Sequence, residues 1–265
     1  MNIEKYFQYN PELDLTVAQI CVHKWDWTSM KSSQSKEAKQ LMLRESFDIV
    51  PIEQSGKITS YFKTVTFGDY SSIMSHNIEQ EDLIYYRLSF SDLIKKMKKE
   101  NRSYYFLHNS DGILGFISLP QLNCLAVFNY LYQALASLER KMIQYIKSIS
   151  TEEKIIEILS ETSCKQSKGL LDYYKKQKQN NVDNSIYEVL YFSTICVRLN
   201  GLEDNVPEKD RGLLKYRKLF SSEQVLGKLR NNVAHPVRPV FSSLESVEVI
   251  NKVLDIQSEI INMLE

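Results

Sequence analysis

The stretch Ser35–Phe62, SKEAKQLMLRESFDIVPIEQSGKITSYF, contains three structural signals in a row. Its first part carries apolar residues at helical spacing and predicts a helix. The apolar segment Asp48–Ile52 predicts a strand, Gly56 predicts a turn, and Lys57–Phe62 predicts a second strand. The stretch therefore predicts a helix–strand–turn–strand module.

A second copy of this module follows in Ser89–Leu122, SFSDLIKKMKKENRSYYFLHNSDGILGFISLPQL. Met42 matches Met97 and Glu45 matches Glu100, both 55 residues apart, and the second copy has one residue inserted at its turn. A repeat at a fixed offset indicates two similar units that pack as a pair.

On these residues, residues 15–123 resemble a tandem pair of CBS domains. The "DIVPI" strand and Gly turn of the first copy and Gly115-Phe116-Ile117-Ser118 of the second carry the resemblance. It implies two β-α-β-β-α modules that often sense adenine nucleotides or related ligands. A structural or dimerising pair remains an equal alternative.

The resemblance also implies positions for ligand-binding residues. In the family, a Thr or Ser followed three residues later by Asp holds the ribose. Ser118 fits the first position, and Gln121 stands where Asp is expected. In the first copy Lys63 occupies the hydroxyl position, with Thr64 adjacent, so a lysine would either meet a phosphate directly or block the site.

From Cys124 onward the pattern becomes helical. Leu125–Ile149, Ser185–Leu199 and Ser242–Leu264 carry apolar residues at helical spacing, whereas residues 200–212 are polar and predict a loop. We therefore expect an α+β amino-terminal region (15–123), an all-α bundle of four or five helices (124–265), and a short arm (1–14).

The segment Leu229–Pro236, LRNNVAHP, suggests chemistry. Arg230 and His235 pair a permanent cation that matches phosphate oxygens with a side chain that exchanges protons near neutral pH. Pro236 disfavours helical backbone at His235, so a helix should end or bend there. Asn231 lies one helical turn before His235. By itself such a pair is more often an ordinary helix-surface and capping arrangement.

This segment resembles the R-x4–6-H signature of HEPN domains. The resemblance implies a helical, metal-independent endoribonuclease that dimerises through the motif and is similar to toxin-like or antiviral RNases. His235 would act as general base or acid, Arg230 would stabilise the phosphate, and Asn231 would orient either group. Because one histidine cannot easily be both acid and base, we expect a homodimer that brings two motifs together. A catalytically silent HEPN fold serving as a nucleotide-responsive scaffold is the alternative.

Other candidates are weaker. Glu139 and Arg140 on the first long helix fit a supporting role or a surface ion pair equally well. His23, His76 and His108 have no partner pattern, and Asp82 resembles a capping residue.

Amino-acid composition further limits the binding partners, cofactors and location that we expect for this protein. Thirty-three basic residues balance 33 acidic ones, but residues 209–238 contain eight basic and two acidic side chains, a local excess that an RNA-binding rim would need. The four cysteines and four histidines form no metal-binding cluster, so we expect no metal and no catalytic cofactor. With no signal sequence and no apolar membrane span, we expect a cytoplasmic protein without a membrane partner.

Overall fold

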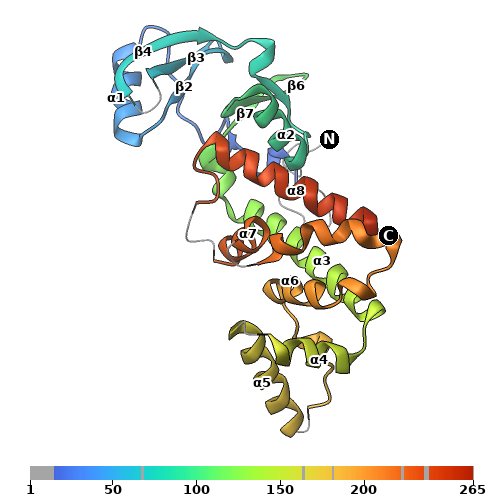
Figure 1. The fold of residues 1–265 in the computed structure, drawn as a ribbon. Coiled ribbons are helices and arrows are strands. Elements are labelled where there is room, and N and C mark those ends of the chain that lie inside the picture. The colour runs from blue at the N-terminus through green and yellow to red at the C-terminus, as the bar shows by residue number, and fades with distance from the viewer. Residues whose placement is uncertain are drawn as a thin grey trace. The chain divides into compact units, whose positions relative to one another are not determined.

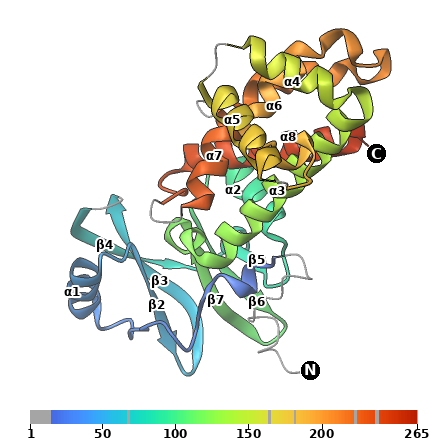
Figure 2. The same cartoon turned by 90° about the horizontal axis from the view of Figure 1, so that it is seen from below.

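The computed structural model describes residues 15–66, 69–162, 165–180, 182–221, 224–235 and 239–264. The chain divides into two compact units (Figures 1 and 2). Unit 1 comprises Met1–Val127 and Phe241–Val247, and unit 2 comprises Phe128–Val240 and Glu248–Glu265. An α+β amino-terminal region followed by a mainly helical region is confirmed. The predicted arm, residues 1–14, lies outside the described residues.

Unit 1 contains two small sheets. The three-stranded sheet has the order β2-β3-β4, formed by Ile49–Gln54, Lys57–Thr66 and Asp69–Asn77. The four-stranded sheet has the order β1-β7-β6-β5, formed by Val22–His23, Gly112–Ser118, Tyr104–Asn109 and Leu83–Tyr85. All neighbouring strands are antiparallel except β5 and β6, which are parallel because helix α2 connects them.

The predicted repeat is present in the backbone. Helix α1 spans Ser35–Glu45 and helix α2 spans Phe90–Glu100, so both ends are offset by 55 residues. Each helix ends in a left-handed residue, Ser46 with φ 57° and Asn101 with φ 50°. The repeat therefore extends to the helix caps.

The strand pairing repeats as well. Ile49 pairs with Lys63 in the first copy, and Tyr104 pairs with Ser118 in the second, again 55 residues apart. The offset is the same on both sides of the turn, so the insertion that the sequence suggested in the second copy is absent. Both hairpins shift register at equivalent points, between Ile52 and Glu53 and between Leu107 and His108. The bulge is thus a shared feature of the module.

The two copies differ after the hairpin. The second copy continues into the 3-10 helix η4 (Leu119–Asn123) and helix α3 (Leu125–Ile149). The first copy continues into strand β4, where the CBS resemblance implied a helix. The composition of β4 does not by itself favour a strand, but β4 pairs with β3, and its Tyr70 and Ile73 pack against the core beneath α1.

Two apolar clusters among the described residues show how the first copy packs. The first lies between α1 and its sheet and contains Ala38, Leu41, Met42, Val50, Ile52 and Phe62. The second joins the two sheets through Tyr61, Tyr104 and Phe106, with Trp27 and Ile49 packed against it. Because Tyr61 and Ile49 belong to the first copy and the other two rings to the second, this aromatic cluster packs one copy on the other.

Unit 2 is helical. Besides most of α3 and α8 (Leu244–Leu264), it contains the α-helices α4 (Glu152–Glu161), α5 (Lys165–Gln179), α6 (Phe192–Gly201) and α7 (Val225–Ala234). It also contains the 3-10 helices η5 (Ile186–Val189), η6 (Glu203–Asn205) and η7 (Glu208–Phe220). Among the described residues, none of the helices combines the length and the apolar character that a membrane crossing needs.

Three sequence predictions for the helical region differ from the structure. Four or five helices were expected, whereas the described residues from Leu125 onward form six α-helices and three 3-10 helices. The expected helix Ser185–Leu199 is split into η5 and α6, because Leu190 and Tyr191 have extended backbone. The expected loop 200–212 contains the start of η7, whose buried Leu213, Tyr216 and Phe220 fix it to the core. The helical spacing of apolar residues does not by itself show where the backbone changes from helical to extended conformation.

Candidate functional site

The Arg/His motif lies on α7, at its carboxyl end. Leu226, Leu229 and Val233 are buried and hold one face of the helix against unit 2. The helix ends at Ala234, and His235 follows with φ −129° and ψ 74°, its backbone N–H donating to the Asn232 carbonyl at 3.2 Å. The end of the helix at His235 is as Pro236 predicts, although Pro236 itself lies outside the described residues.

The motif side chains differ in exposure. Asn231 and His235 are exposed, whereas Arg230 is half-buried. On α3, Glu139 is close enough to Arg230 for their charges to interact. Burial raises the pKa of the Glu139 carboxyl, and the Arg230 charge and the Phe192 N–H oppose that rise without cancelling it. The structure therefore places near Arg230 an acidic group to which the sequence assigned no definite role.

Glu139 is also incompletely satisfied. Its Oε1 atom is buried and has no hydrogen-bond partner among the described residues. The charges of Glu139 and Arg230 therefore attract each other without a hydrogen bond to this oxygen.

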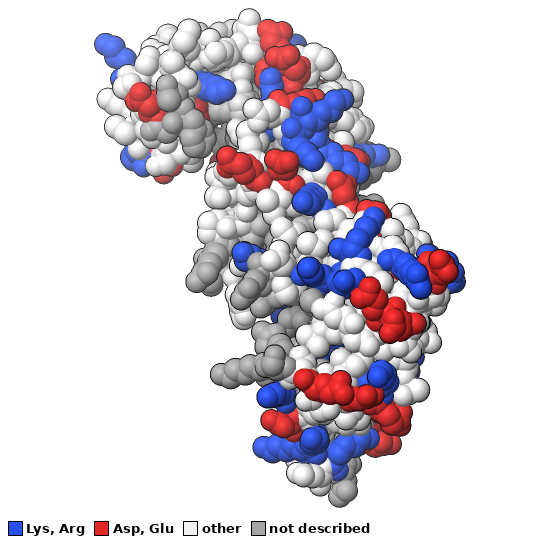
Figure 3. Space-filling view, in the orientation of Figure 1, with Lys and Arg blue, Asp and Glu red and all other residues white. Residues whose placement is uncertain are grey.

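The basic segment is less uniform than its composition suggests. Lys215 forms an ion pair with Glu259 at 2.8 Å, and Arg217 lies 3.7 Å from Glu203. On the face that Figure 3 shows, basic and acidic side chains are interspersed. The remaining exposed cations, Lys209, Arg211, Lys218 and Lys228, are the part of the segment that could contact an RNA backbone.

The predicted ligand residues of unit 1 do not form one group. Ser118 precedes η4, and both its backbone N–H and its hydroxyl donate to Gln121 Oε1, so these side chains cap the turn. Thr64 is buried, and its hydroxyl has no partner among the described residues. Lys63 is adjacent to Thr64 on β3, so its side chain points to the opposite face of the sheet.

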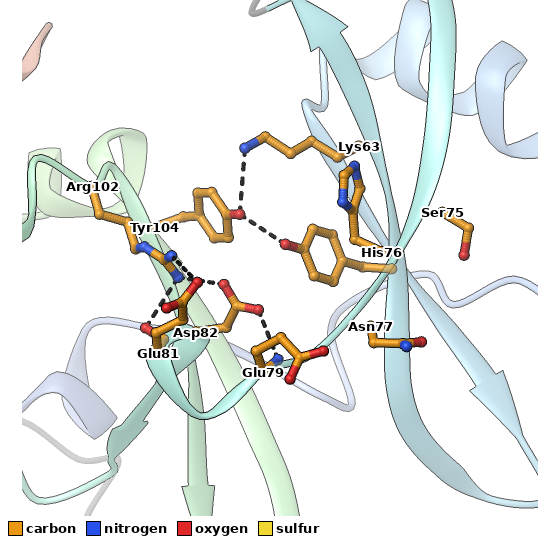
Figure 4. Close-up of a pocket in the computed structure, with 10 residues that line it drawn as sticks. Lys63, Ser75, His76, Asn77, Glu79, Glu81, Asp82, Arg102 and Tyr104 are labelled. Carbon is orange, nitrogen blue, oxygen red and sulfur yellow. Dashed lines mark hydrogen bonds and ion pairs between the residues drawn. The ribbon is translucent and has the colours of Figure 1, made fainter.

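Lys63 lines a cavity of about 400 Å³ (Figure 4). Its Nζ atom donates to the Tyr104 hydroxyl at 3.4 Å and lies 4.8 Å from the centre of that ring. The Tyr104 and Tyr61 hydroxyls are hydrogen-bonded at 2.9 Å, and the His76 ring stacks on Tyr61 at 5.6 Å. Burial, followed by the bond to Tyr104, raises the pKa of Tyr61, so the hydroxyl stays protonated.

The opposite wall of the cavity is an ion cluster. Arg102 forms ion pairs with Asp82 and Glu81 and also donates to the Glu81 carbonyl at 3.0 Å. Burial opposes the charge of Arg102, but Asp82 outweighs this effect and raises the Arg102 pKa. Arg102 and the roles of His76 and Asp82 were not predicted from the sequence, because only the packing of the two copies brings these residues together.

Neither the end of α7 nor the cavity at Lys63 resembles a metal site. Among the described residues, no three His, Cys, Asp or Glu side chains are grouped so that they could hold a metal ion. A comparison with models of known protein families gives no match, and a comparison with curated proteins gives none either.

Proposed function

We propose that the chain is a metal-independent endoribonuclease of the HEPN type, with Arg230, Asn231 and His235 as its catalytic residues. The observation that supports this best is the arrangement at the end of α7. His235 is exposed where a large substrate can reach it, and Asn231 is one helical turn away. Arg230 lies on the same helix, near the half-buried Glu139.

The proposed reaction is a transesterification. A histidine takes the proton of the ribose 2′-hydroxyl, the 2′-oxygen attacks the phosphorus, and the 5′-oxygen leaves with a proton from a second acid. The products are a 2′,3′-cyclic phosphate and a 5′-hydroxyl. Arg230 stabilises the charge on the phosphate oxygens in the transition state, where electrostatic stabilisation contributes most.

A homodimer supplies the second acid in this proposal. Two chains that bring their α7 ends together place two His235 side chains at one phosphate, so that one can act as base and the other as acid. Light scattering at micromolar concentration should then give the mass of a dimer. A fully active monomer would contradict the shared site.

The test of the RNase uses an RNA panel in EDTA. His235→Ala and Arg230→Ala should each lower the cleavage rate at least about a hundredfold, which corresponds to a loss of roughly 3 kcal/mol of transition-state stabilisation. His108→Ala, which removes a histidine from unit 1, should cleave at the wild-type rate. Cleavage by His235→Ala at the rate of the wild type would rule out the assignment.

The second candidate function is a catalytically silent scaffold that responds to a ligand, and the cavity at Lys63 favours it. By resemblance to CBS pairs the ligand would be an adenine nucleotide or a related molecule. In that case the purified protein should leave every RNA intact while mononucleotides, dinucleotides or cyclic oligonucleotides raise its melting temperature. If instead unit 1 regulates an active RNase, ligand binding and cleavage should both be measurable in one preparation.

A further inference from the structure

The two cationic side chains that line the unit 1 cavity differ in whether they form ion pairs. Arg102 is matched by Asp82 and Glu81, so its charge is already satisfied. Lys63 is half-buried and, within the described part of the chain, no carboxylate lies within ion-pair distance of it. The cavity therefore offers one cation that can take an anionic group from a ligand.

A hydroxyl donor accompanies this cation. Because Lys63 can only donate, the Tyr104 oxygen accepts from it. The Tyr61–Tyr104 contact uses one of the two phenolic O–H groups, whichever residue donates. The other O–H remains free to donate to a ligand, so Lys63 and one tyrosine together can bind the two oxygens of a carboxylate.

Glu79 is the matching group of opposite sign. It lines the same cavity and is exposed, and no ion pair joins it to another described residue. In Figure 4 the Glu79 carboxylate lies apart from Arg102, and Lys63 lies across the cavity from it. Outside the ion cluster of Arg102, the cavity lining therefore has one cation, Lys63, and one anion, Glu79, that form no ion pair with another described residue.

The total charge argues against a polyphosphate. Two cations, Lys63 and Arg102, face the three acidic residues Glu79, Glu81 and Asp82, so the lining carries more negative than positive formal charge. A highly anionic ligand would be repelled by the acidic wall, whereas a ligand with a cationic end would be attracted to it.

We propose that this cavity binds a small organic zwitterion, with its carboxylate at Lys63 and the tyrosine hydroxyls and its ammonium at Glu79. The cavity volume of about 400 Å³ is suited to a molecule of amino-acid size. The inference rests on the ligand-binding role proposed for unit 1 and is independent of RNase activity in unit 2.

Isothermal titration calorimetry on the full chain tests the inference. The probes are the L-amino acids, the series β-alanine, 4-aminobutyrate and 6-aminohexanoate, and AMP and ATP. At least one zwitterion should bind, and the series reports the spacing between the two charged groups. Its relatives with only one charge, such as hexanoate and hexylamine for 6-aminohexanoate, should bind at least about tenfold more weakly.

Variants separate the cavity from the rest of the surface. Lys63→Met and Glu79→Gln should each weaken zwitterion binding at least about tenfold, whereas Lys57→Met, an exposed lysine on the same strand, should bind normally. Should Lys63→Met unfold, the exposed Glu79→Gln variant decides the matter. Failure of every zwitterion to bind, tighter binding of AMP or ATP, or binding indifferent to both variants would overturn the inference. RNA cleavage by the same samples is scored separately.

Discussion

The two copies of the repeat in unit 1 share a backbone but not a chemistry. Their helices, caps, hairpin registers and bulges coincide at an offset of 55 residues. At the facing positions the side chains diverge: Tyr104 and Arg102 of the second copy correspond to Ile49 and Phe47 of the first. The cavity is nevertheless lined from both copies, by Lys63 and His76 of the first and by Arg102 and Tyr104 of the second.

Backbone pattern and surface chemistry thus vary independently in this module. The repeat is maintained by buried positions such as Met42 and Met97, which are fully buried in both copies. Positions that face the other copy are free to become aromatic or ionic, provided that each buried polar group keeps a partner. Substitutions at the positions where the copies differ should therefore have unequal effects.

The ion pair between Asp82 and Arg102 belongs to the second copy alone, because the first copy has Phe47 at the position of Arg102. Asp82 is buried, and its carboxylate also accepts the Glu79 N–H at 2.9 Å. Asp82→Asn should lower the free energy of unfolding by about 3 kcal/mol, because it leaves Arg102 without its buried counter-charge. Urea unfolding measures the loss.

Glu81→Gln provides the control for that change. It removes the other partner of Arg102, but the Glu81 side chain is 74% exposed. The expected loss is below about 0.5 kcal/mol, as for other exposed ion pairs. Equal losses in the two variants would mean that burial does not distinguish the two partners.

Gly115 corresponds to Ser60, and the two sites tolerate a side chain differently. A Cβ atom at Gly115 would lie 2.8 Å from the Val22 carbonyl oxygen and 2.9 Å from the Cys21 Sγ atom, because β1 pairs closely with β7 there. Gly115→Ala should therefore lower the free energy of unfolding by about 2 kcal/mol through overpacking. The matched Ser60→Ala should change it little, and a well-tolerated Gly115→Ala would show that β1 can move away.

Much of unit 1 follows from its sequence. The stripe containing Met42, the Gly56 turn and the 55-residue offset predict the helices and hairpins that the structure contains. Strand β4 was not predictable from the repeat, because its place in the module is decided by packing of Tyr70 and Ile73 beneath α1. The local sequence pattern thus predicts the helix and hairpin of each copy, whereas tertiary packing determines which element follows the hairpin.

The candidate sites were predictable to different degrees. Arg230 and His235 both lie at the carboxyl end of one helix, so a local motif is enough to find them. Glu139, on another helix, is identified only when folding brings it near Arg230. Lys63 was found by its offset from Ser118, but Glu79 and Arg102 lack such a signal and enter the cavity through tertiary packing.

Glu100 and Glu45 end the two equivalent helices, with unequal partners. Glu100 accepts hydrogen bonds from Lys96 at 2.6 Å and Tyr105 at 2.7 Å. Burial opposes ionisation of Glu100, but the bonds from Lys96 and Tyr105 outweigh it and hold its pKa below the usual value. Glu100→Gln should cost about 1 kcal/mol near neutral pH, after allowance for its partial exposure, and Glu45→Gln should cost almost nothing.

The sign of the pH dependence follows from the lowered pKa of Glu100. A carboxyl whose folded-state pKa is depressed stabilises the protein above its unfolded-state pKa, and loses that contribution as pH falls through the folded-state pKa. The difference between wild type and Glu100→Gln should therefore shrink below about pH 4. A difference that stays constant from neutral to acid pH would show that ionisation is not its cause.

The smallest expected effects concern the two helix caps. Ser46 and Asn101 both adopt left-handed backbone, and the residues after them donate to the carbonyls of Met42 and Met97 at 3.0 and 3.1 Å. The cap geometry is thus the same, and only the residue that must adopt it differs. Asparagine tolerates left-handed backbone better than serine, because its short amide can hydrogen-bond locally.

Exchanging the cap residues isolates that difference. Ser46→Asn should raise the free energy of unfolding by about 0.5 kcal/mol, and Asn101→Ser should lower it by a similar amount, since each variant installs the other copy's residue in the same geometry. Denaturant titrations of both variants beside the wild type measure the two changes. Shifts of the same sign would show that neighbouring side chains, rather than the preference of the residue for left-handed backbone, decide how each copy ends its helix.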